Sequence, residues 1–415
     1  MSRLLTLKNN FSVKVISGVR GVGKSTLLKM FAEELRAEGV VEEEIIFVNC
    51  AGDERLKNFR TLYEVVEEQT AELEKFFLLV DEVDCVAEGE KAINALFVGA
   101  PAEIYATASS EAFVEKISAL LPENCDVLKM YPLSFAECEK NFPSEDALKN
   151  YLHFGGMPEV VGAREKFLPR LVRGLTYEII FDLVEKNFLQ RAEFFRKMLT
   201  AFAQNVGKPL SLNHMLEILG DAGYSHSNKN YFHLCAALFR RIPRFDIRKE
   251  EFLPGADKFY CIDNGILHTL AAVDEDTLAE NAICIELLRR GYSVYSGKLG
   301  KMSVTFMAVR GREKVFVQVL ATSAPARRPS LPDVTAIEMS GTSAAAFAAR
   351  HSRRRLFSSK NTPKRVKSRS DRNAQNSKSM NIITSETTMP AAYMRRNVFC
   401  RLGVFAVRKR SSHPA

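Results

Sequence analysis

Residues 18–25 have the types and the spacing of a loop that binds phosphate. They read GVRGVGKS and match the pattern G-x-x-x-x-G-K-[ST] at every fixed position. Glycines allow the backbone to curve around an anion, so that consecutive N–H groups and the start of the next helix face it. The sequence therefore predicts a site for the phosphates of a nucleotide. The expected contact residues are Gly18, Gly21, Val22, Gly23, Lys24, Ser25 and Thr26.

Three residues at the end of this loop have distinct expected roles. Lys24 places a cation beside the β- and γ-phosphates, which gives it a catalytic role in addition to a binding role. The Ser25 hydroxyl is expected to be a ligand of Mg²⁺, and Thr26 is expected to contact the α-phosphate. The expected ligand is therefore a nucleoside triphosphate with Mg²⁺.

A second motif, at residues 76–82, is an apolar run that ends in two acids and reads FFLLVDE. A buried strand of this kind delivers its last residues to one edge of a sheet. Asp81 is expected to hold Mg²⁺, and Glu82 to orient and polarise the attacking water, since phosphoryl transfer depends on positioning and charge stabilisation. The pair favours hydrolysis over binding alone and makes Glu82 a candidate catalytic residue. Asp84 is expected to cap the next helix.

Small hydroxyl residues end another expected strand, because residues 107–110 read TASS. One of them could contact the γ-phosphate, or the serines could simply cap the following helix. Both interpretations stay open at this point. Spacing alone assigns no arginine that would complete the site.

Strands and helices alternate around these motifs, which predicts an α/β fold with a parallel sheet. The loop lies between a strand and a helix, as phosphate binding requires. Strands are expected at 11–17, 44–49, 76–80 and 103–108, and helices at 24–38, 62–73 and 111–121.

The rest of the chain divides by pattern into three further parts. A helical region follows the first domain, and Ser211 and Ser227 precede two short helices that look like a helix-turn-helix followed by a wing. A small α/β domain comes next, with strands near 259–262, 293–295, 303–309 and 315–320 and a helix at 277–290. The expected domains are 1–140, 141–250, 251–320 and 321–415.

The chain has 415 residues and a net charge of +8, but this charge is unevenly distributed. Residues 321–415 contain 19 Lys and Arg against 4 Asp and Glu, a net charge of +15, which leaves −7 for residues 1–320. The total charge therefore gives no argument that the folded part binds nucleic acid. The tail is basic and of low complexity, and we expect it to be mostly disordered. A frameshift in the gene would explain the simultaneous change of charge and periodicity near Ala321.

The eight cysteines include no pair at the two-residue spacing of common zinc and redox sites. The sequence also lacks a run of about 20 apolar residues, the length needed to cross a bilayer. We therefore expect reduced thiols, no metal apart from Mg²⁺, no membrane partner and a cytoplasmic location.

Several segments together resemble one family. In chain order they are GVRGVGKST, FFLLVDEVD, ATASS, YPLSFAE at 131–137, YLHFGGMPE at 151–159 and KFYCIDNG at 258–265. This order resembles the prokaryotic AAA-type P-loop ATPases that carry a helix-turn-helix region and a C-terminal, restriction-endonuclease-like domain of unknown function. The resemblance covers about residues 1–320 and implies that the nucleotide is ATP and that the sheet is a P-loop NTPase core.

Two departures from the family change what is expected. Where relatives have Gly-Arg before the Pro-Leu-Ser-Phe segment, residues 123–125 are Glu-Asn-Cys, so an arginine that senses the nucleotide is missing there and hydrolysis is expected to be slow. In the last domain Glu280 and Gln318 persist, but residues 304–306 lack the family's acid. Two-metal cleavage needs clustered carboxylates, so we expect this domain to be an inactive cap.

Two functions follow from these observations. The first is an ATPase that couples nucleotide state to domain movement. The alternative is a nucleotide-gated module that binds DNA or a protein and hydrolyses little ATP. The helix after residue 228 could enter a major groove with Lys229, Asn230 and His233 leading, or it could serve only as rigid packing between domains. An oligomer is compatible with both functions.

Overall fold

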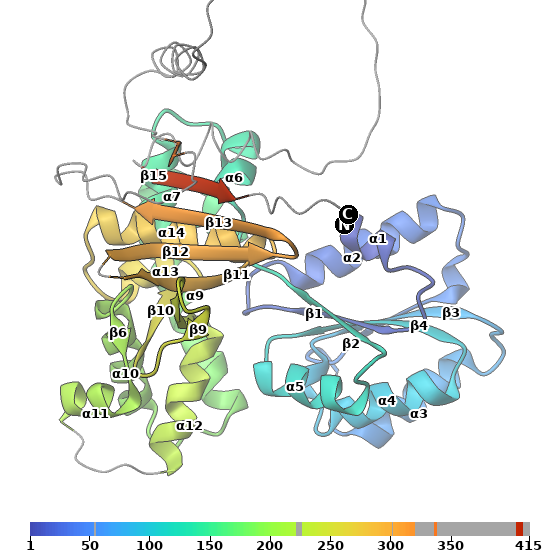
Figure 1. Cartoon of the computed structure of the whole chain (residues 1–415). Coiled ribbons are helices and arrows are strands. Elements are labelled where there is room, and N and C mark those ends of the chain that lie inside the picture. The colour runs from blue at the N-terminus through green and yellow to red at the C-terminus, as the bar shows by residue number, and fades with distance from the viewer. Residues whose placement is uncertain (54, 221–225, 301, 320–335, 338–403, 410–415) are drawn as a thin grey trace, which may run out of the picture.

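The computed structural model describes residues 1–53, 55–220, 226–300, 302–319, 336–337 and 404–409. Figure 1 shows two bodies side by side: a sheet flanked by helices at the N-terminal end of the chain, and a larger body that contains the other helices and sheets. Most of the basic tail, and the tight turn expected between the two short helices, lie outside the described residues.

The first body is built on a parallel sheet of five strands. Its order is β2-β3-β4-β1-β5, and every neighbouring pair runs parallel. The expected α/β parallel sheet is therefore confirmed. The strands are β1 (Val13–Ser17), β2 (Ile45–Asn49), β3 (Phe76–Asp81), β4 (Ala102–Ala108) and β5 (Cys125–Lys129).

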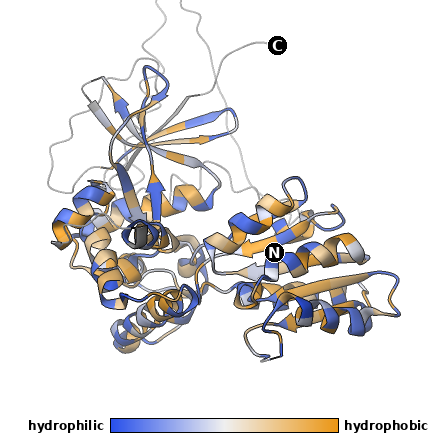
Figure 2. Ribbon diagram, turned by 90° about the horizontal axis from the view of Figure 1, so that it is seen from below, coloured by the Kyte–Doolittle hydropathy of each residue, from blue (hydrophilic) through white to orange (hydrophobic). Residues whose placement is uncertain are grey.

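Helices cover both faces of this sheet, which explains why β3 is apolar without interruption. Leu78 and Val80 point into the core shared with three helices, whereas Phe77 and Leu79 pack on the other face beneath α2. In Figure 2 the strands of this sheet are mostly orange, the colour of apolar residues, and the helices around them are striped. The helices are α1 (Ser2–Thr6), α2 (Lys24–Ala37), α3 (Phe59–Thr70), α4 (Gly89–Gly99) and α5 (Glu111–Leu120), with short 3₁₀ turns at Glu42–Glu44 and Val83–Cys85.

The second body begins with helices and continues into two sheets. A small antiparallel sheet has the order β6-β10-β7, and a larger one has the order β14-β15-β13-β12-β11-β8-β9. The helices are α6 (Phe135–Asn141), α7 (Ala147–Phe154), α8 (Pro158–Val161), α9 (Leu168–Lys186), α10 (Ala192–Gln204), α11 (Leu212–Leu219), α12 (His226–Leu234), α13 (Asn264–Leu270) and α14 (Glu275–Arg289), with 3₁₀ turns at Glu165–Phe167 and Cys235–Ala237. The strands are β6 (Pro209–Leu210), β7 (Phe239–Ile242), β8 (Arg244–Asp246), β9 (Glu251–Phe252), β10 (Asp257–Cys261), β11 (Ser293–Leu299), β12 (Met302–Arg310), β13 (Glu313–Val319), β14 (Ala336–Ile337) and β15 (Val404–Lys409).

Strand pairing crosses the boundary that the sequence suggested between residues 250 and 251. β8 precedes this point but pairs with β11, and β10 follows it but pairs with β7. The connection between β7 and β10 is long enough to add two strands to the neighbouring sheet, so the two expected units share their strands. β15 belongs to the basic tail and pairs antiparallel with β13. The composition of the tail did not predict this strand.

Buried polar groups join the helical region to the start of α13. Asp263 is buried, and its carboxylate accepts hydrogen bonds from the backbone N–H groups of Gly156 at 2.7 Å, Gly265 at 2.8 Å and Ile266 at 3.2 Å. Gly155 has a φ of 77°, and a Cβ there would lie 2.0 Å from Asp263 Oδ1. Residues 155–156 and 263–265 therefore pack directly against each other. This close packing and the hydrogen bonds to Asp263 explain the glycines and the aspartate at these positions.

Replacing Asp263 by alanine should destabilise the protein strongly. Three backbone donors would lose their acceptor in the interior, which we expect to cost about 3 kcal/mol. Asp274→Ala is the matched control, because Asp274 caps α14 through the Thr277 N–H at 2.7 Å and is near the surface. Loss of an N-cap costs about 1 kcal/mol. The midpoint of urea unfolding compares the two variants, and equal shifts would contradict the role of Asp263 in this packing.

Candidate nucleotide-binding site

The predicted phosphate loop joins β1 to α2 with a backbone that leaves several donors unused. Gly21 and Gly23 have φ angles of 78° and 100°, which side chains disfavour. Within the described residues, the backbone N–H groups of Gly21, Gly23, Lys24 and Ser25 make no hydrogen bond. Unused donors at the start of a helix attract an anion. The loop therefore presents unused backbone donors at the position where the sequence motif predicts phosphate binding.

Lys24 lies inside this loop and is 5% exposed. Its Nζ donates a hydrogen bond to the Val19 carbonyl at 3.1 Å. Burial lowers the pKa of Lys24, against the opposing influence of nearby acids, of which Asp84 is the largest. A bound phosphate would supply the negative charge that this buried ammonium needs.

Ser25 and Asp81 come together although 56 positions separate them. The Ser25 Oγ donates to Asp81 Oδ1 at 3.1 Å, and the Thr107 Oγ1 donates to the same oxygen at 2.6 Å. Asp81 is 5% exposed at the end of β3. A hydroxyl and a carboxylate oxygen are hard donors of the kind that Mg²⁺ takes, so these residues fit the ion that the sequence predicts.

Glu82 leaves the sheet in a different direction from Asp81. Its backbone has a φ of 54° and a ψ of 46°, the left-handed region, which costs a non-glycine residue about 1 kcal/mol. The Glu82 N–H donates to Thr107 Oγ1 at 2.8 Å, and this contact helps to hold the turn. The carboxylate is partly exposed and accepts a contact from the Cys85 thiol at 3.8 Å. Strain of this kind is commonly kept where a side chain must point into a site.

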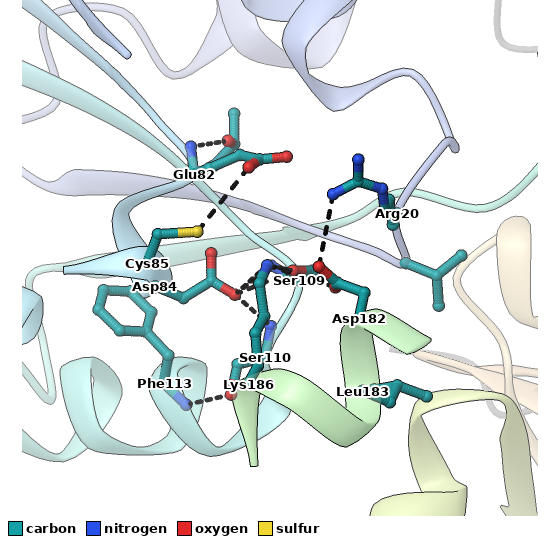
Figure 3. A network of polar contacts seen from close by, with 12 residues as sticks. Arg20, Glu82, Asp84, Cys85, Ser109, Ser110, Phe113, Asp182, Leu183 and Lys186 are labelled. Atoms are coloured by element: carbon teal, nitrogen blue, oxygen red, sulfur yellow. Dashed lines mark hydrogen bonds and ion pairs between the residues drawn. The ribbon is translucent and has the colours of Figure 1, made fainter. Parts of the chain in front are cut away.

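The structure corrects the expected role of Asp84. Asp84 does not cap α4, whose N-cap is Glu88 without a side-chain hydrogen bond. Instead, Asp84 Oδ2 accepts hydrogen bonds from the Ser109 N–H at 3.0 Å, the Ser109 hydroxyl at 2.9 Å and the Ser110 N–H at 2.9 Å (Figure 3). The residues at the end of β3 and β4 are thus tied together.

Of residues 107–110, the structure shows a helix-capping role for Ser110 alone. Ser110 is the N-cap of α5 and accepts from the Phe113 N–H at 3.3 Å, so it has the capping role. Thr107 contacts Asp81 and Glu82, and Ser109 contacts Asp84. Neither of these two is a cap, and both lie among the acids of the candidate site.

The second body contributes groups that sequence reasoning missed. Lys186, at the end of α9, donates to the Ser109 hydroxyl at 2.8 Å and pairs with Asp182 at 3.4 Å. Asp182 also pairs with Arg20 of the phosphate loop at 3.4 Å, as Figure 3 shows. No spacing rule could find Lys186, because it is 77 positions from Ser109 and still farther from the phosphate loop and the acids of β3.

The loop is also covered by apolar side chains of the second body. Val19 and Val22 belong to the same core as Met157 and Leu175. A Cβ at Gly21 would lie 3.0 Å from the Leu175 side chain and 3.3 Å from that of Met157. The loop therefore packs directly against Met157 and α9.

The position that lacks the family's arginine lies at the opposite end of the sheet. Residues 123–125 lead into β5, where Cys125 pairs with Val13, whereas Lys129 pairs with Ser17 beside the loop. A side chain at 123–125 is thus at the amino ends of the strands and away from this chain's own loop. An arginine at this position would therefore not contact a nucleotide bound in the loop of the same chain.

The candidate nuclease residues are not gathered into a metal site. Glu280 accepts a hydrogen bond from the Tyr260 hydroxyl at 2.6 Å, and Gln318 accepts one from the Thr305 N–H at 3.2 Å. Over the described ranges, no group of three or more His, Cys, Asp or Glu side chains could hold a metal ion. Glu280 and Gln318 therefore have packing partners of their own.

A parallel sheet with this loop after β1 and these acids after β3 defines a P-loop NTPase of the α/β class. Family comparison agrees: residues 10–139 match the model of an AAA domain, and residues 145–277 match a domain of unknown function (DUF8612). A protein of Haemophilus influenzae (strain ATCC 51907 / DSM 11121 / KW20 / Rd), described as an uncharacterized protein, is 30% identical over an alignment of 339 positions that covers 77% of this chain and 85% of that protein. The chain belongs to the same family as this relative, and its residues 10–139 form an AAA domain.

A viral NTPase of known structure is a distant match to this chain. The genome packaging NTPase B204 of Sulfolobus turreted icosahedral virus 2, solved in complex with AMPPCP, is 14% identical and covers 33% of this chain and 85% of its own. Its TM-score of 0.22 is too small to support an inference. Among the described helices, none has the length and apolar character to span a bilayer.

Proposed function

We propose that the protein hydrolyses ATP with Mg²⁺ and transmits the nucleotide state to its second body. The observation that carries this proposal is the convergence on Asp81 of the Ser25 hydroxyl from the loop and the Thr107 hydroxyl from β4, with Glu82 next in the chain. The phosphate loop is sufficient for nucleotide binding. Hydrolysis needs, in addition, acids beside the loop that hold Mg²⁺ and orient the attacking water.

Each residue of the site has a role in the proposed reaction. The loop N–H groups and Lys24 hold the β- and γ-phosphates, and Thr26 contacts the α-phosphate. Ser25 and Asp81 hold Mg²⁺, which neutralises charge on the phosphate oxygens when it is bound. Glu82 orients the attacking water and accepts its proton.

Coupling to the second body follows from the contacts of the loop. Val19 and Val22 are packed in the core of the helical region, and Arg20 is paired with Asp182 of α9. Closely packed interiors transmit small displacements because they have no free volume to absorb them. A change of loop conformation on phosphate binding would therefore move α9 and the elements behind it.

Mg²⁺-dependent release of phosphate from ATP by the full chain tests the proposal. We expect turnover that requires Mg²⁺ and stops when a chelator is added. ATP binding without any phosphate release would contradict the hydrolytic function and leave the nucleotide as a ligand.

A second function, nucleotide-gated binding of duplex DNA, is favoured by α12. The chain runs from α10 through β6, α11 and α12 to β7, and β10 follows after β8 and β9. β6, β10 and β7 form one small sheet beside these helices, an arrangement that resembles a winged helix. On α12, Lys229, Asn230 and His233 are exposed, as a helix that enters a groove requires. Arg240, at β7, is bonded to Glu111 at the start of α5, so this unit also contacts the nucleotide-binding body.

Lys229→Ala should weaken the binding of a short duplex at low salt, and should reduce the slope of log affinity against log salt by about one. A mobility shift with and without ATP measures this. Lys149→Ala removes the same charge from the exposed side of α7 and is the matched control. Equal binding by both variants and the wild type would exclude α12 as the contact.

A further inference from the structure

A cation from the second body reaches the middle of the candidate site. The sheet order places β4 between β3, which ends in the acids, and β1, which leads into the phosphate loop. Lys186 Nζ lies at the tip of β4, 2.8 Å from the Ser109 hydroxyl. Its side chain is 21% exposed and comes from α9, outside the nucleotide-binding sheet (Figure 3). Lys186 therefore stands between the two motifs that the reaction needs.

The contacts of Lys186 leave it able to bind an anion. An ammonium has three N–H donors, and in the described part of the chain Lys186 uses one in a hydrogen bond, to Ser109. Its distances to Asp182 and Asp84 are 3.4 and 3.6 Å, which are ion pairs without hydrogen-bond geometry. Asp84 Oδ2 is already shared by three donors from Ser109 and Ser110. The acids thus keep the ammonium in place without saturating it.

The charges around Lys186 also favour its ionised form. Burial alone would lower the pKa of Lys186, but Asp84 and the other nearby groups outweigh this effect, so the pKa is raised. Lys24 and Lys186 lie close enough for each to influence the other, since Lys186 contributes to the lowered pKa of Lys24. Lys24 and Lys186 repel each other, so nearby negative charge, from the acids or from a bound phosphate, is needed to keep both ionised.

The other cations near the site are less suited to this role. Arg20 is half exposed on the loop itself and faces Asp182. Arg240 is bonded to Glu111 and to the Ala236 carbonyl, and Arg289 to Glu286 and the Pro132 carbonyl. Lys186 combines partial burial, unused donors and a position between the acids and the loop.

We propose that Lys186 contacts the terminal phosphate of ATP within the same chain, and so makes the position of α9 depend on whether the nucleotide is a triphosphate or a diphosphate. This inference rests on the proposed nucleotide site. Contact with the terminal phosphate would move the ammonium away from Asp182 and Asp84, and α9 with it.

Equilibrium binding of ATP and ADP to the full chain, with Mg²⁺, tests the inference. Lys186→Gln should weaken ATP binding roughly tenfold, since a charged hydrogen bond is lost, and should leave ADP binding within about twofold. Lys186→Arg, which keeps the charge, should restore the preference for ATP. Lys197→Gln removes a charge from the exposed side of α10 and should resemble the wild type.

The ratio of the two affinities separates a phosphate contact from a structural role. A loss of packing at α9 would lower ATP and ADP binding together, so equal effects in Lys186→Gln overturn the inference, as do unchanged affinities. The inference would also be contradicted if Lys186→Arg lost the preference for ATP over ADP as fully as Lys186→Gln does. If the wild type and Lys197→Gln bind neither nucleotide, the proposed function itself fails, which is a distinct result.

Discussion

Replacing Lys24 by alanine should abolish tight nucleotide binding, with an affinity for ATP reduced roughly a hundredfold or more. Lys24 is 5% exposed, and its ammonium donates a hydrogen bond to the Val19 carbonyl, so it already points into the proposed phosphate loop. Charged hydrogen bonds to two phosphate groups are each worth about 1.5–3 kcal/mol, and alanine supplies neither. Titration of the full chain with a fluorescent ATP analogue measures the loss.

Lys29→Ala is the matched control for this variant. Lys29 lies on the same helix, α2, but is exposed. The Lys29→Ala variant should bind ATP with the affinity of the wild type. Thermal unfolding without nucleotide shows whether Lys24→Ala remains folded, and tight ATP binding by folded Lys24→Ala would remove the phosphate loop from the proposed site.

Replacing Glu82 by glutamine should keep ATP binding and abolish turnover. Glutamine has nearly the same shape and keeps the left-handed turn, but it cannot accept a proton from the attacking water. We expect phosphate release to fall roughly a hundredfold or more, and the dissociation constant for ATP to change by less than about threefold. Single-turnover hydrolysis and equilibrium binding on the same preparation separate these two effects.

Glu88→Gln provides the comparison for Glu82→Gln. Glu88 also has a left-handed backbone, with a φ of 57°, and its side chain is half exposed and paired with Lys91. Its substitution should leave turnover unchanged. If turnover were equal in Glu82→Gln and the wild type, Glu82 could not be the residue that activates water, and another acid at the edge of the sheet would have to be sought.

The two variants together distinguish the two functions considered for this chain. An ATPase loses turnover in both variants, but loses binding only in the Lys24 variant. A nucleotide-gated module with little hydrolysis shows no difference between Glu82→Gln and the wild type, and its response to ATP appears in DNA or protein binding. The Lys186 variants then show whether the second body senses the terminal phosphate.

Local motifs predicted much of the nucleotide-binding body. The expected strands at 11–17, 44–49, 76–80 and 103–108 correspond to β1, β2, β3 and β4 with shifts of one or two residues at their ends. The apolar run of β3 was informative because both faces of the sheet are covered. α4 and β5 were not expected. The buried residues of α4, at 89, 92, 93 and 96, do follow helical spacing, whereas the partly buried residues of β5 do not alternate.

The sequence by itself determined the loop, the acids and their order, because phosphate binding requires particular residue types at short, regular separations. It could not assign Lys186 or Asp84, or place residues 123–125 at the far end of the sheet. It also could not show that β8 and β10 exchange partners across an expected boundary. Those facts depend on contacts between residues far apart in the chain, which have no local pattern. α9 packs against the tip of β4, residues 125–129 pair with β1, and β8 and β10 pair with strands of different sheets.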